Sequence, residues 1–296
     1  MSNQLFRSCA VIAVALVCTS AYAEEGTMPI GEAELSYVSE GEGVPVVFVH
    51  GAISDLRVWD AYRPIIADDR RIVAYTQRYF GTGEWPDDGE NFQRSTHVDD
   101  LIAFVEGLDT RPIHLVTWSY SGEIGIHAML RRPDLFRSAV HYEPVLDRLV
   151  EGVAGGANAS RELFGHFGPA VRAAQENRPE DAALRFIEAV FKLPDGEAVG
   201  ETGEQMWRDN GRTVPLYLAM EPPQAIDCET LGHLTAPTLV VQGADSFTRF
   251  SIMSERVASC VANGMIVTIP DVNHDGPYRK PSEFGAIIES FIALTE

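Results

Sequence analysis

Short apolar runs alternate with helical patterns along most of the chain. The apolar runs are rich in β-branched residues and predict strands at 46–49, 71–75, 113–116, 138–142, 238–241 and 265–269. Several of them are almost continuously apolar, which is typical of strands buried on both faces of a parallel sheet. Apolar residues at helical spacing predict helices over 96–108, 122–131, 251–261 and 281–294. Thr96 and Asp99 form a capping-box-like pair at the start of the first. This alternation predicts an α/β fold with a mostly parallel, doubly wound sheet.

The alternation stops between residues 145 and 235, where the sequence shows helical patterns only. It returns to a strand pattern at Thr238. A helical insertion between two strands of one sheet is expected to emerge at the carboxyl ends of the strands, where open α/β sheets bind their ligands. We therefore predict that residues 145–235 form a cap over a core made of residues 24–144 and 236–296. The alternative is a set of peripheral helices with no role at a site.

Residues 1–23 have the pattern of a secretory signal peptide. Arg7 supplies a positive charge, residues 9–18 form an apolar run of 10, and Ala21-Tyr22-Ala23 has small residues where a signal peptidase reads. The run is far shorter than the ~20 residues that span a bilayer. We predict cleavage after Ala23, no stable membrane insertion, and export to the periplasm or secretion. An uncleaved anchor is the alternative.

Composition and charge narrow the class of protein. Hydrophobic residues make up 45% and charged residues 22% of the 296 residues, which argues against disorder. There are 23 Lys and Arg against 43 Asp and Glu, a net charge of −20, so we predict no nucleic-acid partner. Cleavage would leave Cys228 and Cys260, which are either joined by a disulfide or remain as two buried thiols. No histidine shows metal-ligand spacing, so we predict no metal site.

A serine stands where a buried strand runs directly into a helix, which is the context of a nucleophile elbow. The segment reads Thr117-Trp118-Ser119-Tyr120-Ser121. Strand and helix backbones approach closely there, so the residues two before and two after the nucleophile must be small. For Ser119 these are Thr117 and Ser121, whereas Ser121 would place Glu123 in that crowded space. We therefore predict that Ser119 is the nucleophile, although Thr117 departs from the glycine of G-x-S-x-G. The alternative is a structural serine at a strand end.

Two other strand ends offer the remaining groups of an acyl-transfer site. Strand 46–49 ends in His50-Gly51-Ala52, and the amides of Ala52 and Tyr120 are predicted to form an oxyanion hole, with His50 in a structural role. His274 follows strand 265–269 and, of the 8 histidines, is the one late enough in the chain for the order Ser, acid, His. His274 is therefore the predicted general base.

These features together resemble the α/β-hydrolase superfamily. Residues 140–144 and 77–79 look like those of bacterial capped hydrolases known as esterases, enol-lactonases or haloperoxidase-like proteins. The resemblance implies a serine hydrolase that needs no cofactor and acts on a small-molecule substrate. We expect an exported enzyme that cleaves esters or lactones of small carboxylic acids through an acyl-enzyme. A non-catalytic ligand-binding protein on the same frame is the first alternative, and a carbon–carbon bond hydrolase or acyltransferase with the same triad is the second. Epoxide hydrolases and haloalkane dehalogenases are disfavoured, because they carry Asp where this chain has Ser119.

The acid of the triad is left open between two carboxylates. In the usual arrangement of the resembling family the acid lies three residues past Gly243, and Ser246 occupies that place. Asp245 is one residue early, and a shifted turn could present it. Glu143 ends strand 138–142, where some capped relatives such as haloalkane dehalogenases carry their acid. Pro144 would restrict the backbone of Glu143 to extended conformations. We favour Glu143 over Asp245.

Residues that could bind substrate are less well defined by the sequence. Arg78 follows a strand end and either binds a substrate carboxylate or braces its loop against nearby acids. Aromatic side chains of the insertion either line a pocket or pack the core of the cap: Phe164, Phe167, Trp207 and Tyr217. The sequence does not predict an oligomeric state.

Overall fold

The computed structural model describes residues 23–67, 70–193, 200–221 and 225–296. The predicted signal peptide lies outside these ranges, except for Ala23. None of the described helices combines the length and the apolar character that crossing a membrane requires.

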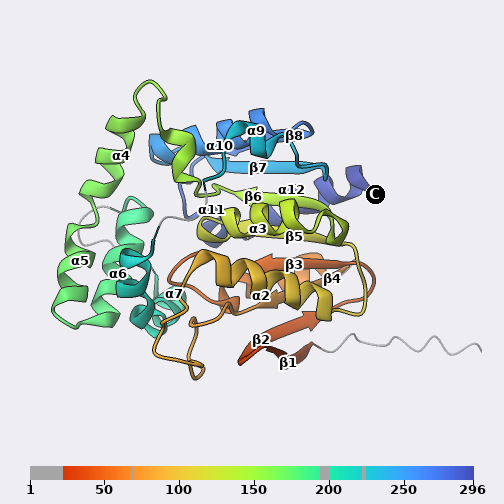
Figure 1. The fold of residues 1–296 in the computed structure, drawn as a ribbon, viewed down its shortest axis with the longest axis horizontal. Coiled ribbons are helices and arrows are strands. Elements are labelled where there is room, and N and C mark those ends of the chain that lie inside the picture. The colour runs from red at the N-terminus through yellow and green to blue at the C-terminus, as the bar shows by residue number, and fades with distance from the viewer. Residues whose placement is uncertain (1–22, 68–69, 194–199, 222–224) are drawn as a thin grey trace, which may run out of the picture.

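Eight strands form one sheet in the order β1-β2-β4-β3-β5-β6-β7-β8 (Figure 1). Their bounds are β1 Glu24–Ile30, β2 Ala33–Glu40, β3 Pro45–Val49, β4 Arg71–Tyr75, β5 Ile113–Trp118, β6 Phe136–Tyr142, β7 Thr238–Gly243 and β8 Gly264–Ile269. The six predicted strands are confirmed and pair in parallel from β4 to β8. The antiparallel hairpin β1–β2 was not predicted. The switch in strand order lies between β3 and β5, where such sheets open a crevice at the strands' carboxyl ends.

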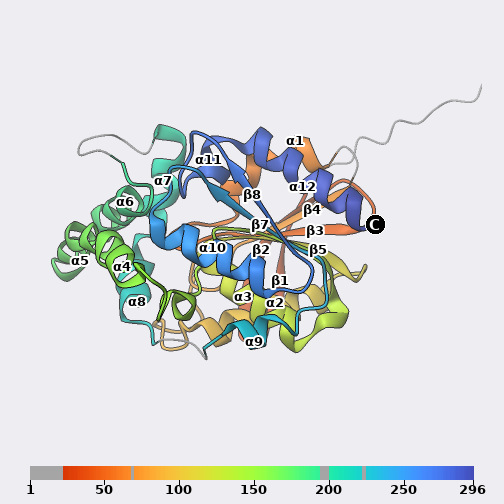
Figure 2. The ribbon, with the colours of Figure 1, turned by 90° about the horizontal axis from the view of Figure 1, so that it is seen from above.

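Helices cover both faces of the sheet, as Figure 2 shows. One face carries α1 (Arg63–Ile66) and α12 (Pro281–Thr295), and the other carries α2 (Arg94–Gly107), α3 (Tyr120–Arg131) and α9 (Cys228–Leu231). The remaining core helices are α10 (Thr248–Cys260) and α11 (Gly276–Arg279). Alternate residues of β3 point into two separate hydrophobic clusters, with Phe48 in one and Val47 in the other. Burial on both faces is what makes these strands continuously apolar.

Helix α2 begins two residues before the predicted capping pair. Its N-cap is Gln93, and no side chain caps the first turn. The carboxylate of Asp99 pairs instead with the guanidinium of Arg131 on α3, 2.7 Å away. The predicted capping box is therefore wrong, because the helix begins at Arg94 and Thr96 lies inside its first turn instead of at the N-cap.

Of the α-helices described between β6 and β7, five form one end of the molecule (Figure 1). They are α4 (Gly156–Gly165), α5 (Gly168–Gln175), α6 (Pro179–Val190), α7 (Glu201–Asp209) and α8 (Val214–Ala219). Helix α9 falls within the range 145–235 but packs against α10, and Leu231 joins the cluster beneath the sheet. The division into core and cap thus stays a prediction at the level of its boundaries.

Asn210 fastens the inserted helices to the loops of the sheet. Its side chain is fully buried, and its Oδ1 accepts a hydrogen bond from the amide of Gly81 at 2.6 Å. Its Nδ2 donates to the carboxylate of Asp55 at 2.7 Å. Arg57 adds an ion pair to Asp209 at 2.8 Å. The insertion is therefore held over the carboxyl ends of β3 and β4 by buried polar contacts, which favours one fixed position.

A disulfide joins Cys228 at the start of α9 to Cys260 at the end of α10. The two Cα atoms are 5.0 Å apart and the cysteines are separated by 32 positions. The bond therefore joins α9, the last helix before β7, to α10, the helix that follows β7. Of the two possibilities open from the sequence, the structure contains the bonded pair.

We expect the protein beginning at residue 24 to show no thiol that reacts with iodoacetamide in denaturant without reductant. The Cys228→Ser, Cys260→Ser double variant should lose about 2–4 kcal/mol of unfolding free energy, because a closed loop of this length restricts the unfolded chain. Mass spectrometry after alkylation and a urea titration measure the two effects. Two alkylated cysteines in the unreduced protein would show that the bond is absent.

Candidate active site

Ser119 lies in a strained turn between β5 and α3. Its φ is +58° and its ψ −114°, a conformation that a residue with a side chain rarely adopts. The backbone around it is held to the end of β6: the Ser119 amide donates to the carbonyl of Tyr142 at 2.9 Å, and the Val145 amide donates to the carbonyl of Ser119 at 3.1 Å. The turn therefore projects the Ser119 side chain into the pocket above the sheet.

The neighbours of Ser119 explain how the turn tolerates Thr117. The residue of α3 that faces Thr117 is Gly125, where a Cβ would lie 2.9 Å from the Thr117 methyl carbon. The Thr117 hydroxyl shares a hydrogen bond of 2.6 Å with His141 Nδ1, and burial lowers the pKa of His141 to about 4, so that this imidazole stays neutral. Thr117 thus fits because the helix lacks a side chain opposite it.

Ser121 does not point toward the pocket. Its side chain is fully buried, and its hydroxyl donates to the carbonyl of Val49 at 2.8 Å. This contact ties the start of α3 to the end of β3. The geometry therefore leaves Ser119 as the hydroxyl that can react.

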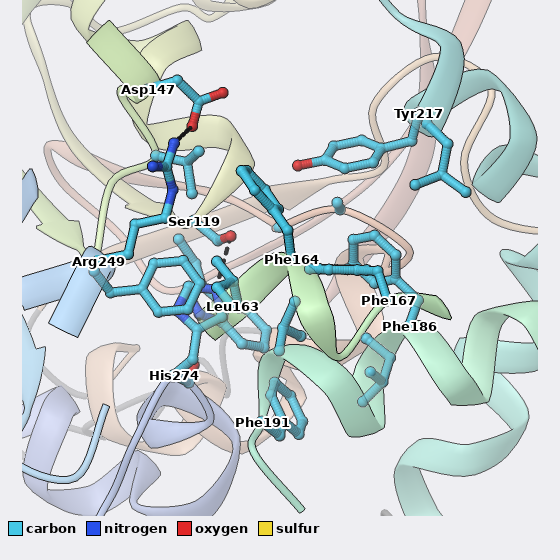
Figure 3. A pocket seen from close by; sticks show the side chains of 18 of the residues that line it. Ser119, Asp147, Leu163, Phe164, Phe167, Phe186, Phe191, Tyr217, Arg249 and His274 are labelled. Atoms are coloured by element: carbon cyan, nitrogen blue, oxygen red, sulfur yellow. Dashed lines mark hydrogen bonds and ion pairs between the residues drawn. The ribbon is translucent and has the colours of Figure 1, made fainter. Parts of the chain in front are cut away.

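His274 lies between Ser119 and Glu143. Its Nε2 is 2.8 Å from Ser119 Oγ (Figure 3). Its Nδ1 is 2.7 Å from Glu143 Oε2. The ring of Phe250 stacks on the imidazole with centroids 4.0 Å apart and planes 7° apart. The Trp118 indole donates to the His274 carbonyl at 3.0 Å. A hydroxyl, an imidazole and a carboxylate are thus hydrogen-bonded in series, which is what activation of a serine by a general base requires.

Glu143 is fully buried at the end of β6, and neighbouring groups of β7 and its loop hold its second oxygen. Oε1 accepts hydrogen bonds from the Gly243 amide at 2.7 Å and from the Ser246 hydroxyl. The expectation that Pro144 keeps Glu143 extended is wrong, because its φ is +41°. This turn fits because Gly122 lacks a side chain: a Cβ there would lie 2.4 Å from the Pro144 Cβ.

Asp245 is not brought to the histidine. Its side chain is exposed, and its backbone amide donates to the carbonyl of Val272 at 2.9 Å. Ser246, which lies three residues past Gly243, donates its hydroxyl hydrogen to Glu143. Of the two carboxylates that the sequence left open, the structure therefore places Glu143 against His274.

Ala52 lines the pocket that contains Ser119, and Tyr120 follows Ser119 directly in the chain. Tyr120 is the first residue of α3, so its N–H has no partner within the helix. The described residues offer no acceptor to the Ala52 amide, and the next residue, Ile53, is held at φ +54°. The Tyr120 phenol is hydrogen-bonded to His97 Nδ1 at 2.6 Å, and burial lowers the pKa of His97 to about 3. Both N–H groups are therefore available to an oxyanion.

Arg78 lies outside the pocket that contains Ser119. Its guanidinium forms a bidentate pair with the buried carboxylate of Asp100 at 2.9 and 2.7 Å, and its carbonyl is 3.2 Å from His97 Nε2. Of the two roles that the sequence left open for Arg78, these contacts are those of the bracing role, because Asp100 already pairs with Nε and Nη2 of the guanidinium. His50 is likewise structural, since its Nε2 accepts a hydrogen bond from the Gln77 amide at 3.0 Å.

The pocket over Ser119 has a volume of about 310 Å³ and lies between the sheet and the inserted helices. Most of its wall is aromatic or aliphatic, and the predicted Phe164, Phe167 and Tyr217 belong to it (Figure 3). Trp207 is instead fully buried against Phe191. Three charged residues of the wall were not predicted, namely Arg94, Asp147 and Arg249. They lie on separate elements, and no sequence spacing relates them to the serine. Among the described residues, no three His, Cys, Asp or Glu side chains cluster as metal ligands.

Replacing each candidate acid by its amide tests the assignment. Glu143→Gln should lower kcat for 4-nitrophenyl acetate by about 10³–10⁴, because the amide cannot stabilise the imidazolium or hold its tautomer. Asp245→Asn is the matched control and should change kcat little. Circular dichroism and melting temperature check that both variants fold. The opposite pattern, with Asp245→Asn crippled, would assign the acid to Asp245.

Comparisons with known proteins give the family. BpoC of Mycobacterium tuberculosis, which carries the name non-heme bromoperoxidase, is 27% identical over 268 residues, covering 88% of this chain and 97% of its own. An esterase from Thermogutta terrifontis superposes with a TM-score of 0.69 at 22% identity, over 93% of this chain and 99% of its own. The structure titled Est816, an N-acyl homoserine lactone degrading enzyme, superposes with a TM-score of 0.62 at 23% identity, over 90% and 100%. The family model described as "Alpha/beta hydrolase family" matches residues 46–287. This chain belongs to the α/β-hydrolase family.

Proposed function

We propose that this protein is an exported serine hydrolase that cleaves esters or lactones of small carboxylic acids through an acyl-enzyme. The observation that carries the proposal is the series of hydrogen bonds from Ser119 through His274 to Glu143, at 2.8 and 2.7 Å. Family membership alone does not carry it, because one fold serves many functions. The similarity to an esterase and to a lactone-degrading enzyme agrees with this class of reaction.

The proposed reaction begins when Ser119 Oγ attacks the ester carbonyl while His274 Nε2 takes its proton. Glu143 stabilises the resulting imidazolium and keeps Nδ1 as the protonated nitrogen. The amides of Ala52 and Tyr120 donate to the oxyanion of the tetrahedral intermediate. His274 returns the proton to the leaving alcohol, and a water molecule then releases the acyl group with His274 again as base.

The pocket supports a small and largely apolar acyl or alcohol group. Its volume of about 310 Å³ is at the lower end of ligand sites, and phenylalanine rings make up much of its wall. The small-molecule substrate therefore fits within the space between α3 and the inserted helices.

Reaction with a fluorophosphonate probe tests whether the serine is activated. The wild type and Ser121→Ala should be labelled, because the Ser121 hydroxyl is directed at the Val49 carbonyl. Ser119→Ala should not be labelled and should lose hydrolysis of 4-nitrophenyl acetate. A wild-type protein that shows neither labelling nor turnover would be a non-catalytic binder. Turnover only with a substrate whose carbon–carbon bond is cleaved would identify a carbon–carbon bond hydrolase. Turnover only in the presence of an acceptor alcohol would identify an acyltransferase.

Export rests on the residues 1–23 pattern and on the disulfide, which persists in oxidising compartments. Protein recovered from the periplasm or medium of a Gram-negative host should begin at Glu24. Intact-mass measurement checks this, and a variant with Ala21→Arg and Ala23→Arg, which disrupts the small residues at the cleavage site, is the control. A retained N-terminus in the wild-type protein would overturn the proposed cleavage.

A further inference from the structure

The pocket contains two arginines that differ in how their charge is balanced. Arg249 pairs with Asp147 at 2.5 Å, and it also donates to the hydroxyl of Ser160. Its guanidinium lies over the Phe164 ring, 5.0 Å from the centroid, and Figure 3 shows the pair with Asp147 at the edge of the pocket. Both terminal nitrogens of Arg249 thus already have hydrogen-bond acceptors within the protein.

Arg94 is less well satisfied, although only 7% of its surface is exposed. Its Nε forms an ion pair with Glu123 on α3 at 2.8 Å. Its Nη1 is 3.9 Å from the sulfur of Met220, a weak acceptor. Among the described residues, no oxygen accepts a hydrogen bond from either terminal nitrogen. A guanidinium has five N–H donors, and the nitrogen of Arg94 that is buried without a hydrogen-bond partner is Nε, whose contact with Glu123 is an ion pair only. Arg94 therefore presents unsatisfied donors and a positive charge to the pocket it lines.

Tyr217 brings a second donor to the same region from the inserted helix α8. Its ring packs edge-on against Tyr120, with centroids 5.5 Å apart. The Arg94 guanidinium lies over that same Tyr120 ring, 5.2 Å from its centroid. The Tyr217 hydroxyl is directed into the pocket (Figure 3) and forms no hydrogen bond with a described residue. Burial raises the pKa of Tyr217, so the hydroxyl keeps the proton that it would donate. Arg94 and Tyr217 thus both contact the ring of Tyr120, the residue that follows Ser119.

We propose that Arg94 and Tyr217 form a subsite for a carboxylate carried by the substrate, so that the enzyme prefers esters with an anionic group. This inference rests on the proposed hydrolase function and specifies its substrate class. A terminal carboxylate would accept two hydrogen bonds from the planar guanidinium and one from the phenol. In a chain of net charge −20, a local cation of this kind is what allows an anion to enter.

Glu123 makes the subsite depend on pH. Burial raises the pKa of Glu123 to about 7, while Arg94 beside it opposes the rise. Below pH 7 Glu123 is mainly protonated and neutral, so the positive charge of Arg94 is free to attract the carboxylate of a ligand. Above pH 7 the Glu123 carboxylate competes with the ligand for Arg94. A substrate carboxylate has a pKa near 4–5 and stays ionised throughout. The remaining groups that face Arg94 are the phenols of Tyr120 and Tyr217 and the carboxylate of Asp147, which Arg249 holds. Affinity for an anionic ester should therefore rise as the pH falls from 8 to 6.

Calorimetric binding to Ser119→Ala tests the subsite without turnover. Two matched pairs of probes differ in one charge: phenyl hydrogen glutarate with phenyl pentanoate, and 3-acetoxybenzoate with phenyl acetate. In at least one pair the anionic ester should bind about tenfold or more tightly at pH 6, as charge-assisted hydrogen bonds imply. This difference in affinity between the anionic and the neutral ester, the gap, should narrow at pH 8. Equal affinities within both pairs would overturn the proposal.

Substitutions assign the preference to the named residues. Adding Arg94→Met should abolish the gap, whereas Arg212→Met removes an equal charge outside the pocket and should preserve it. Should Arg94→Met fail to fold, Glu123→Gln keeps the guanidinium and should raise the pH 8 affinity to the pH 6 level. A gap that survives Arg94→Met, or a pH dependence that survives Glu123→Gln, would refute the assignment. The binding assay does not depend on turnover. If Ser119→Ala prefers the anionic esters but the wild type hydrolyses none of them, the proposed enzyme activity is refuted and the carboxylate subsite stands.

Discussion

The hydrogen bond between His274 and Glu143 is the contact on which the rest of the site depends. A carboxylate buried at the end of β6 is tolerated because the imidazole, the Gly243 amide and the Ser246 hydroxyl all donate to it. Buried charge is costly unless it is satisfied in this way. The backbone of Glu143 has a φ of +41° in the conformation that brings its carboxylate to His274. Gly122 leaves room for Pro144, the residue that follows. The acid thus comes from β6, while β7 and its loop supply the donors that hold it.

The same end of the sheet gathers the other reactive groups. Strands β3 and β5 flank the switch in strand order, so the Ala52 loop and the Ser119 turn emerge side by side. Residues that follow β3, β5 and β6 adopt positive φ at the site without being glycine, namely Ile53, Ser119 and Glu143. Such conformations cost of order 1–3 kcal/mol each and persist only where surrounding structure enforces them. Here the hydrogen bonds between the parallel strands and the buried contacts of Ser121 and Asn210 hold these residues in place.

Sequence reasoning succeeded where chemistry follows local pattern and failed where it depends on tertiary placement. The doubly buried strands, the serine at a strand–helix junction and the late histidine all have local signals. The choice between Glu143 and Asp245 was open, because the conformation of a few residues after β7 decides which one faces His274. The β1–β2 hairpin was missed because β1 is largely exposed with few apolar residues, and β2 is only partly buried and lacks a continuous apolar run. Arg94 and Tyr217 were not recognised as neighbours, because they lie on α2 and α8 and come together only through the ring of Tyr120, which both contact in the folded chain.

Proton NMR of the free protein observes the central contact directly. An imidazole N–H donated to a buried carboxylate is strongly deshielded, so a single downfield resonance assigned to His274 Nδ1–H is expected. It should persist in Asp245→Asn, move markedly upfield in Glu143→Gln, and be absent from His274→Ala. A resonance unchanged by Glu143→Gln, or one lost in Asp245→Asn, would contradict the account in which β6 supplies the acid.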